Sequence, residues 1–437
     1  MRPENVFRRY DIRGEHPGEI DEAFAELLGK SVGTFSKMEF SGRVIVCRDN
    51  KESSKALKEA LISGLKSSGV KVIDVGMGPT DYAGFSGKEH SAVSVQVTSS
   101  HMPLRFNGFK LMYPEGNGFV NEDLDEVKEI FRERDFSRGE GSYRGMEKTM
   151  KQRYRDRVRM RGSRLGSRRV NARIVVDSLG GATKELLPQL LRDIGVEVIE
   201  ISAEKDEHPY RDPPNPKPEN LEELEKRVEE EDADLGIATD MDGDRLTAYY
   251  NGRFLSGYEV FGLMAQATRS DVVASIDTAR GLEEYLNDIN REVFYTRVGD
   301  PFVMEKALEE DVDLAGEPNG HYAFLEFLPY NSGILTALVL AGTDLEEGLE
   351  ELPDYSVERF SVKVDDREAK MQELEQKIKE KYEVLSEVDG VKFRTDRCDV
   401  LVRPSGSSEK IRVIIQADSE KKVTRDIATV RQLVQNP

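Results

Sequence analysis

Alternating carboxylates give one short segment of the chain the character of a cation site. In the run TDMDGDR, Asp240, Asp242 and Asp244 directly follow the apolar stretch LGIA. Three carboxylates on a loop that leaves a strand suit a hard cation, and Mg²⁺ keeps open positions for a phosphate oxygen. An EF-hand is excluded because Gly243 separates the second and third acids, Arg245 takes the position of the turn glycine, and no Glu closes the loop. An acidic turn in an acidic protein remains the alternative.

A second segment combines hydroxyls, a histidine and a lysine. In VTSSHMPLRFNGFK, a strand ends at Thr98, Ser99, Ser100 and His101, and Lys110 follows nine residues after His101. A hydroxyl on a strand-to-loop turn beside histidine and lysine can act as a nucleophile or a phosphoryl carrier. Ordinary turn chemistry with a structural histidine is the alternative.

A third segment, LVRPSGSSEKIRV, is suited to binding an anion. A turn with hydroxyls, backbone N–H groups and guanidinium groups forms an oxyanion cradle, and arginine adds bidentate phosphate contacts. The spacing is not that of a Walker motif, so nucleotide hydrolysis is not indicated. The residues concerned are Arg403, Ser405, Gly406, Ser407, Lys410 and Arg412.

The fourth segment is AGEPNGHYAF, where Glu317, Asn319 and His321 surround a glycine turn. A carboxylate and an amide on one loop can hydrogen-bond paired sugar hydroxyls, and buried polar groups of this kind discriminate strongly between substrates. A polar turn without a ligand explains the same residues.

The elements that position these segments repeat along the chain. Strand–helix–strand patterns are predicted at 43–76, 173–202 and 272–298, which indicates three α/β domains. Residues 355–434 differ and predict the order β-α-β-β-β-α of a small two-layer α+β domain. We therefore expect four domains, at 1–150, 151–250, 251–352 and 353–437, carrying the second, first, fourth and third segments respectively.

Composition narrows the class of protein. The 437 residues include 63 Lys+Arg and 83 Asp+Glu, a formal charge of −20, which disfavours a protein that coats nucleic acid or anionic membrane. The basic run 144–173 breaks this pattern, and we interpret it as a solvated or acid-paired linker helix rather than a nucleic-acid site. Cys47 and Cys398 are far apart, and no signal peptide or membrane span is predicted. These features indicate a cytoplasmic protein.

Taken together, the four segments resemble the α-D-phosphohexomutase family, which includes phosphoglucomutases, phosphomannomutases and phosphoglucosamine mutases. The family carries T-A-S-H-N-P, D-x-D-x-D-R, G-E-x-S-G-H and R-P-S-G-T-E-P loops in this order along the chain. The four matching segments follow one another in the same order from the N-terminus to the C-terminus here. The openings FRRYDIRG and RDNKESS are similar to the family's F-R-A-Y-D-I-R-G and G-R-D-x-R-x-S-S. The resemblance spans the whole chain.

The resemblance implies a role for each matching residue. Ser100 is expected to carry the phosphoryl group with His101, Lys110 and Arg13 in the catalytic set, and Ser100 is expected to bind one Mg²⁺ with Asp240, Asp242 and Asp244. Sugar and phosphate contacts are expected from Tyr10, Arg245, Glu317, Asn319, His321, Arg403, Ser405, Gly406, Ser407 and Arg412. The implied fold has four domains around a central cleft: three with mixed sheets flanked by helices, and a smaller C-terminal α+β domain.

The implied activity is an isomerase that interconverts hexose 6-phosphate and hexose 1-phosphate through a phosphoserine enzyme, with hexose 1,6-bisphosphate as its intermediate and activator. Its partner is a phosphosugar, with glucose or mannose favoured by GEPNGH and glucosamine by TRVGDPFV. The chain departs from the family at Ser99, Met102, Asn319 and Ser332, where the family has Ala, Asn, Ser and Asp, and at 408–409, where it has Glu-Pro. Met102, Asn319 and Ser332 motivate a non-catalytic sugar-phosphate binder as the alternative from another class, and a metal-dependent phosphatase is the third option.

Overall fold

The computed structural model describes the chain except for residues 1–2, 167–170, 202–210, 407 and 436–437. The chain divides into two compact units. The first unit combines residues 1–256 with 319–343, and the second combines 257–318 with 344–437. Across the described residues, no helix has both the length and the apolar character that a membrane crossing requires.

The first sheet of the first unit is mixed and has the strand order β1-β5-β4-β2-β3-β6. β2 pairs in parallel with β3 and β4, whereas β5 pairs antiparallel with β4 and with β1. The strands are β1 (Ile12–Glu15), β2 (Arg43–Arg48), β3 (Lys71–Met77), β4 (Val93–Val97), β5 (Phe106–Met112) and β6 (Ser142–Gly145). The strand–helix–strand pattern predicted from residue 43 is therefore confirmed.

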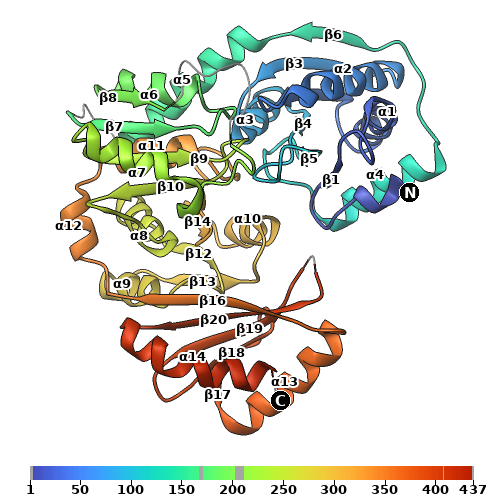
Figure 1. The fold of residues 1–437 in the computed structure, drawn as a ribbon. Coiled ribbons are helices and arrows are strands. Elements are labelled where there is room, and N and C mark those ends of the chain that lie inside the picture. Colours follow the sequence, from blue (N-terminus) through green and yellow to red (C-terminus); the bar gives the residue numbers. More distant parts are fainter. Residues whose placement is uncertain (1–2, 167–170, 202–210, 407, 436–437) are drawn as a thin grey trace. The chain divides into compact units, whose positions relative to one another are not determined.

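Helices cover this sheet and bury its apolar side chains. α1 packs against α2 and α4, while α3 packs against β2 and β4 (Figure 1). The helices are α1 (Glu22–Glu39), α2 (Glu52–Ser67), α3 (Thr80–His90) and α4 (Asn121–Glu133). All five residues of β4 are buried, as expected for a strand covered on both faces.

The second sheet of the first unit has the order β11-β10-β9-β7-β8. β7 is parallel to β8 and β9, and β10 returns antiparallel to β9. The elements are α5 (Glu147–Arg164), β7 (Arg173–Asp177), α6 (Leu186–Asp193), β8 (Glu197–Glu200), α7 (Glu222–Glu230), β9 (Leu235–Thr239), β10 (Leu246–Tyr250) and β11 (Arg253–Phe254). The acidic segment, residues 240–245, thus connects β9 to β10, and we call it the acidic connection.

Two elements from later in the sequence also belong to the first unit. They are β15 (His321–Phe324) and α11 (Gly333–Gly342). α11 packs against α5, α6, β9 and β10, and its apolar run is buried. This long-range packing brings Ser332, the N-cap of α11, close to the acidic connection.

The basic helix α5 behaves as the sequence analysis expects of an acid-paired helix. Met150, Tyr154 and Val158 are buried, while arginines on its outer side pair with acids of neighbouring elements. Arg153 contacts Glu89 at 3.3 Å, and Arg155 contacts Asp193 at 2.8 Å. The remaining residues of the basic run at 167–170 lie outside the described part of the chain.

In the second unit, β12 lies between β13 and β14 and is parallel to both. The elements here are α8 (Gly257–Thr268), β12 (Val272–Ser275), α9 (Gly281–Asp288), β13 (Val293–Thr296), α10 (Asp300–Glu309), β14 (Leu314–Glu317) and α12 (Leu345–Glu350). β14 ends at Glu317, the first polar residue of the GEPNGH segment.

The C-terminal sheet is antiparallel with the order β16-β20-β19-β18-β17. Its elements are β16 (Ser356–Lys363), α13 (Arg367–Lys381), β17 (Glu383–Ser386), β18 (Val391–Arg394), β19 (Asp399–Pro404), β20 (Lys410–Ala417) and α14 (Glu420–Gln435). The predicted α+β class is confirmed, but the predicted strand order omitted β17. This strand is short, carries a register shift against β18, and has no fully buried residue, so its sequence lacks a strong apolar signal.

Candidate active site

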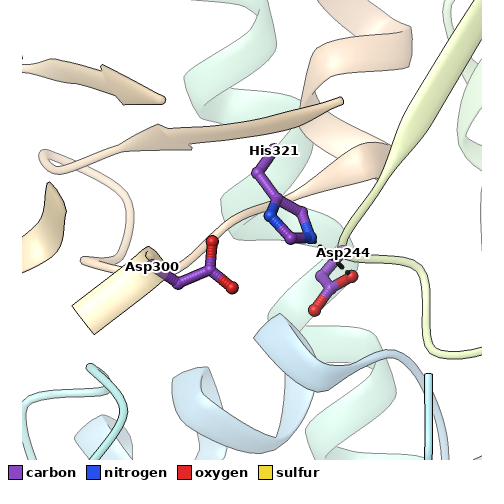
Figure 2. Close-up of side chains that lie close together, drawn as sticks. All are labelled: Asp244, Asp300 and His321. Atoms are coloured by element: carbon purple, nitrogen blue, oxygen red, sulfur yellow. Dashed lines mark hydrogen bonds and ion pairs between the residues drawn. The ribbon is translucent and has the colours of Figure 1, made fainter. Parts of the chain in front are cut away.

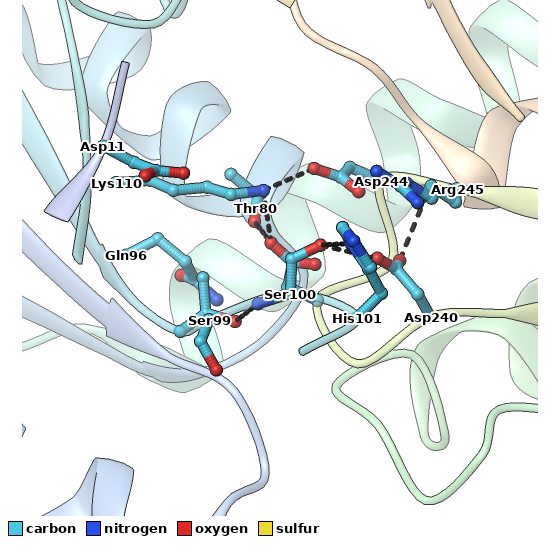
Figure 3. A network of polar contacts seen from close by, with 12 residues as sticks. Asp11, Thr80, Gln96, Ser99, Ser100, His101, Lys110, Asp240, Asp244 and Arg245 are labelled. Carbon is cyan, nitrogen blue, oxygen red and sulfur yellow. Dashed lines mark hydrogen bonds and ion pairs between the residues drawn. The ribbon is translucent and has the colours of Figure 1, made fainter. Parts of the chain in front are cut away.

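Ser100 is held in a strained backbone conformation beside the acidic connection. It follows β4 with a φ of 50°, in the left-handed region that non-glycine residues rarely adopt, and its N–H donates to Thr98 Oγ1 at 2.9 Å. Its Oγ donates to Asp240 Oδ2 at 2.8 Å and lies 3.2 Å from His101 Nδ1 (Figure 3). The local turn therefore directs this hydroxyl at the carboxylates.

The neighbouring hydroxyl, Ser99, makes different contacts. Ser99 Oγ donates to the Phe106 carbonyl at 2.9 Å and lies 2.5 Å from Lys51 Nζ, and both Ser99 and Lys51 are buried. Lys51 Nζ also donates to the Phe106 carbonyl at 3.0 Å. Of the two adjacent serines, Ser100 is thus the one whose hydroxyl contacts the acidic connection.

His101 is a neutral imidazole at physiological pH. Burial, together with the positive charges of Arg245 and Arg13, lowers the pKa of His101 to about 2. A neutral ring has one nitrogen free to accept a hydrogen bond. His101 is therefore suited to support the Ser100 hydroxyl without adding a charge.

The three acidic side chains predicted to bind a metal lie together. One carboxylate oxygen from each of Asp240, Asp242 and Asp244 lies within 4.8 Å of the others, and all three residues are buried. Burial, then the negative charges of Asp244 and Asp242, raises the pKa of Asp240 well above its ordinary value. Repulsion of this kind makes the cluster a site for a cation.

A test of fit for a divalent metal gives a positive answer. The donor set is all oxygen, which Mg²⁺ prefers, and the buried atom Asp242 Oδ1 has no hydrogen-bond partner among the described residues. Ser100 Oγ adds a fourth oxygen next to Asp240. The residues present can therefore hold a hard divalent cation.

Lys110 supplies the positive charge within the cluster. From β5, its Nζ lies 2.7 Å from Asp242 Oδ2 and 2.5 Å from Asp244 Oδ2. Burial opposes ionisation of Asp244. The opposing effects of Lys110, His321 and then Arg245 are larger, and they hold the pKa of the Asp244 carboxyl well below its usual range. Asp244 is therefore a charged carboxylate in this site.

Further polar residues of the first unit surround the cluster. Arg245 donates its N–H to Asp240 Oδ1 at 3.2 Å and its Nε–H to His321 Nε2 at 3.0 Å. Figure 2 shows His321 directed at Asp244, with Nε2 3.3 Å from Oδ1. Asn319 Oδ1 accepts the His321 N–H at 3.3 Å, which shapes the turn before β15.

The N-terminal candidates lie around β1. Arg13 is in β1 and its Nε lies 2.7 Å from Asp11 Oδ2. Burial opposes the charge, but Asp11, Asp242 and Asp244 raise the pKa of Arg13 above its ordinary value. Tyr10 is in the preceding bend, with the Arg9 guanidinium 5.3 Å from its ring centroid.

The second unit carries the remaining candidates. Glu317 Oε1 accepts the Gly299 N–H at 2.9 Å. Arg403 on β19 lies opposite Arg412 on β20, and Arg403 Nε lies 2.7 Å from Asp389 Oδ2. Burial, and then the charge of Arg403, lowers the pKa of Arg412. Two neighbouring guanidinium groups of this kind favour an anionic ligand.

The turn after β19 is the segment that the sequence predicts to bind an anion. Ser405 is buried, its N–H donates to the Lys410 carbonyl at 2.9 Å, and its Oγ lies 3.1 Å from Ser408 Oγ. Gly406 is exposed. Ser407 lies outside the described residues.

Two residues near the acidic connection were missed from the sequence. Thr80 Oγ1 donates to Asp242 Oδ2 at 2.7 Å, and Lys51 bonds Ser99 as described above. Lys51 lies in the RDNKESS run, so the family resemblance could have singled it out. Thr80 has no such signal, because a threonine at a helix start is common capping chemistry.

Comparisons with known proteins agree with this geometry. The chain matches the descriptions "Phosphoglucomutase/phosphomannomutase" alpha/beta/alpha domain I over residues 4–138, domain II over 152–252, domain III over 256–359 and the C-terminal domain over 361–432. It is 33% identical to a phosphoglucomutase/phosphomannomutase of Thermococcus kodakarensis over 95% of both chains. It is 32% identical to a protein of Methanopyrus kandleri described as "Probable phosphoglucosamine mutase", over 94% of this chain and 93% of the other.

A solved structure supports the fold. A phosphoglucomutase/phosphomannomutase family protein from Burkholderia thailandensis has a TM-score of 0.85 and 24% identity, and the match covers 99% of this chain and 97% of the other. Four domain matches that span most of the sequence, numbered I to III and C-terminal in chain order, accompany the loop geometry described above. The chain belongs to the phosphoglucomutase/phosphomannomutase family.

Proposed function

We propose that this protein is a phosphohexomutase that interconverts hexose 6-phosphate and hexose 1-phosphate, with Ser100 as its phosphoryl carrier. The observation that carries the proposal is the contact of Ser100 Oγ with Asp240 within a cluster of three buried carboxylates. A hydroxyl next to a divalent-cation site is suited to accept and return a phosphoryl group. Enzymes of this type are isomerases, and this chain belongs to the family that contains them.

Each half of the reaction exchanges one P–O bond for another. In the first half, the bond from phosphorus to Ser100 Oγ breaks as a bond forms to a free hydroxyl oxygen of the hexose phosphate. The hydroxyl loses its proton and Ser100 Oγ gains one, and Lys110, with His101 and Arg13 beside it, assists this transfer. The product of this half is a hexose 1,6-bisphosphate, whose other phosphoryl group returns to Ser100 in the second half.

Asp240, Asp242, Asp244 and the phosphorylated Ser100 would hold one Mg²⁺. When bound, the ion neutralises charge on the phosphoryl group that is transferred. The chain's own residues position the phosphoryl carrier: the Thr98 hydroxyl accepts the Ser100 N–H at 2.9 Å and holds the backbone of the turn, and Asp240 Oδ2 accepts the Ser100 hydroxyl at 2.8 Å. Fixed dipoles and charges of this kind lower the cost of reorganisation during transfer.

The substrate must be bound at both ends, because either phosphate can be the one transferred. We assign the sugar hydroxyls to Glu317, Asn319 and His321. Contacts to the phosphate that is not being transferred are assigned to Arg403, Ser405, Gly406, Ser407 and Arg412, and further polar contacts to Tyr10 and Arg245. The paired arginines on β19 and β20 support this assignment, since a dianion would offset their mutual repulsion.

We propose glucose and mannose phosphates as the substrates, with glucosamine phosphate as the second candidate. The first candidate rests on the GEPNGH segment and on the name of the Thermococcus relative. The second rests on TRVGDPFV and on the name of the Methanopyrus relative. Both candidates share the phosphoserine chemistry and differ in the group at C2 of the sugar.

Domain limits of 1–150, 151–250, 251–352 and 353–437 are part of this proposal. They are supported by the family matches, which leave short connections near each limit. A cytoplasmic location is also proposed, since two buried free cysteines suit a reducing compartment.

The test is a set of coupled assays with Mg²⁺ and glucose 1-phosphate, mannose 1-phosphate or glucosamine 1-phosphate, with free phosphate measured in parallel. We expect the hexose 6-phosphate to form faster from glucose 1-phosphate or mannose 1-phosphate than from glucosamine 1-phosphate, with little release of free phosphate. Dominant turnover of the glucosamine substrate would select the second candidate. Phosphate release equal to substrate loss would indicate a phosphatase, and binding without turnover a non-catalytic binder, and either result would overturn the proposal.

A further inference from the structure

Asp81 is a buried carboxylate for which the proposed chemistry has no role. It lies in the first turn of α3 and is 1% exposed. Its Oδ2 accepts the Tyr154 hydroxyl of α5 at 2.6 Å and the Ser332 hydroxyl at 2.5 Å. Residues far apart in the sequence, from three helices, thus meet at one oxygen.

Ser332 has two functions at this point. Its Oγ caps α11 by accepting the Leu335 N–H at 3.1 Å, and the same hydroxyl donates to Asp81. The family resemblance places an Asp at this position. In this chain the carboxylate comes instead from α3, and the side chain at 332 is a hydroxyl that binds it.

The residues next to Asp81 and Ser332 bind the backbone of the acidic connection. The Thr80 N–H donates to the Asp242 carbonyl at 2.9 Å, and the Gly333 N–H donates to the Gly243 carbonyl at 3.0 Å. Two consecutive carbonyls between the metal-binding carboxylates are therefore held by the first residues of α3 and α11.

Gly333 shows how closely α11 approaches this connection. A Cβ at this position would lie 2.8 Å from the Gly243 carbonyl oxygen and 2.9 Å from that of Arg245. Contacts this short leave no room for a side chain, and a small shift of the α11 start would break or distort them. The position of α11 relative to α3 thus fixes the acidic connection.

We propose that Asp81 is a positioning residue for the acidic connection, and that it acts through its hydrogen bond with Ser332. The bond joins the starts of α3 and α11, and their backbone N–H groups in turn fix the segment between Asp242 and Asp244. The inference rests on the proposed function, because it takes that segment as the metal site. Residues that orient metal ligands typically change metal affinity by about 10- to 100-fold when they are replaced.

The first test is Mn²⁺ binding to the full-length protein by calorimetry, which is independent of turnover. Asp81→Asn and Ser332→Ala are each expected to weaken Mn²⁺ binding by about tenfold or more. Tyr154→Phe is the matched control, because it removes the other hydrogen bond to Asp81 Oδ2 and leaves the bond from Ser332 in place. Tyr154 lies on α5, which is also held by the ion pairs Arg153–Glu89 and Arg155–Asp193. We expect the Tyr154→Phe variant to bind Mn²⁺ within about twofold of the wild-type protein.

The second test separates positioning from a general loss of stability. Ser332→Asp alone places two carboxylates together in a buried site, so it should weaken Mn²⁺ binding at least as much as Ser332→Ala. Asp81→Asn/Ser332→Asp moves the carboxylate to position 332 and keeps a hydrogen-bond partner at 81, so binding should recover toward the wild-type value. Recovery in the double variant is a non-additive result that two independent destabilising changes would not give.

The outcomes distinguish this inference from the proposed function. Wild-type-like Mn²⁺ binding in Asp81→Asn and Ser332→Ala would overturn the positioning role while leaving the metal site intact. Equal weakening in Tyr154→Phe, or no recovery in the double variant, would also overturn it, because the effect would then be general. A wild-type protein that fails to bind Mn²⁺ would overturn the metal site itself, and the inference with it.

Discussion

Ser100 Oγ donates a 2.8 Å hydrogen bond to Asp240 Oδ2, a residue 140 positions further along the chain. Ser100 follows the end of β4, and Asp240 follows the end of β9. Ligand sites in α/β sheets form outside the carboxyl ends of strands, where the connecting loops converge. Here two sheets contribute one such loop each, and the contact between them joins the proposed phosphoryl carrier to the proposed metal site.

The first prediction concerns the two adjacent serines. Ser100→Ala removes the proposed phosphoryl acceptor and should lower mutase kcat by about 10³-fold or more. Ser99→Ala removes a hydrogen bond to Lys51 in a buried site and should reduce the free energy of unfolding by about 1–3 kcal/mol while kcat changes little. Steady-state assays and urea unfolding of both variants check this, and a comparable loss of kcat in Ser99→Ala would reverse the assignment.

The second prediction concerns the effect of the metal on stability. Because buried carboxylates repel one another, Mg²⁺ should stabilise the folded protein and raise its melting temperature. At a Mg²⁺ concentration of 100 times its Kd, the free energy of unfolding should rise by about 2.7 kcal/mol. Asp242→Asn should abolish this Mg²⁺-dependent gain, as should chelation by EDTA in the wild-type protein. Glu223→Gln, on the exposed side of α7, is the control and should keep it. An equal Mg²⁺ response in Asp242→Asn would place the ion elsewhere.

The third prediction is a pH dependence of stability due to Asp81. Burial raises the pKa of Asp81 from 3.8 to about 7, even though the hydrogen bonds from Ser332 and Tyr154 act in the opposite direction. The folded state thus binds the proton more tightly than the unfolded chain. The stabilisation of the folded state that comes from this tighter proton binding by Asp81 is fully present below pH 3.8. It is lost as the pH rises through about 7. The groups that face the carboxyl are Tyr154, Ser332, the Tyr82 backbone and, at longer range, Asp244.

Urea unfolding of Asp81→Asn and wild type between pH 5 and pH 8 tests the sign. The variant should gain stability relative to wild type as the pH rises, by at most about 3 kcal/mol over this range, since one pKa unit corresponds to about 1.4 kcal/mol and about two units lie between pH 5 and the raised pKa. A difference between the two proteins that stays constant over this range would show that Asp81 does not titrate there.

The fourth prediction concerns binding of the phosphate that is not transferred. Arg403→Lys keeps the charge but loses the planar fork that binds a phosphate through two N–H groups. We expect KM for the phosphosugar to rise about tenfold with a smaller change in kcat. Arg431→Lys on the exposed side of α14, where the guanidinium stacks on Phe360, is the control. A fall in kcat at unchanged KM would argue instead for a role in the transfer step.

The sequence was most informative where function depends on a short continuous segment. The acidic run, the serine loop and the apolar strands that precede them are local patterns, and their strands lie where periodicity predicts them. β17 was missed because a short edge strand with half-buried residues has no apolar alternation to detect.

Contacts between distant segments could not be predicted in this way. From the sequence, Ser332 was only a departure from the family pattern, and nothing in the sequence singled out its partner Asp81. Their hydrogen bond exists because α11 packs into the first unit against α5, α6, β9 and β10, and tertiary packing of that kind leaves no trace in local spacing. Lys51 and Ser99 likewise form a pair that depends on the placement of two loops.

The most direct measurement is phosphopeptide mass spectrometry of the purified protein during turnover, after incubation with ³²P-labelled glucose 1,6-bisphosphate, Mg²⁺ and glucose 1-phosphate. The label should appear on the peptide that contains Ser100, be absent from it in Ser100→Ala, and pass into hexose 6-phosphate at the rate of turnover. Turnover with the label on Ser99, or with no phosphorylated peptide at all, would contradict the assignment of Ser100 as the phosphoryl carrier.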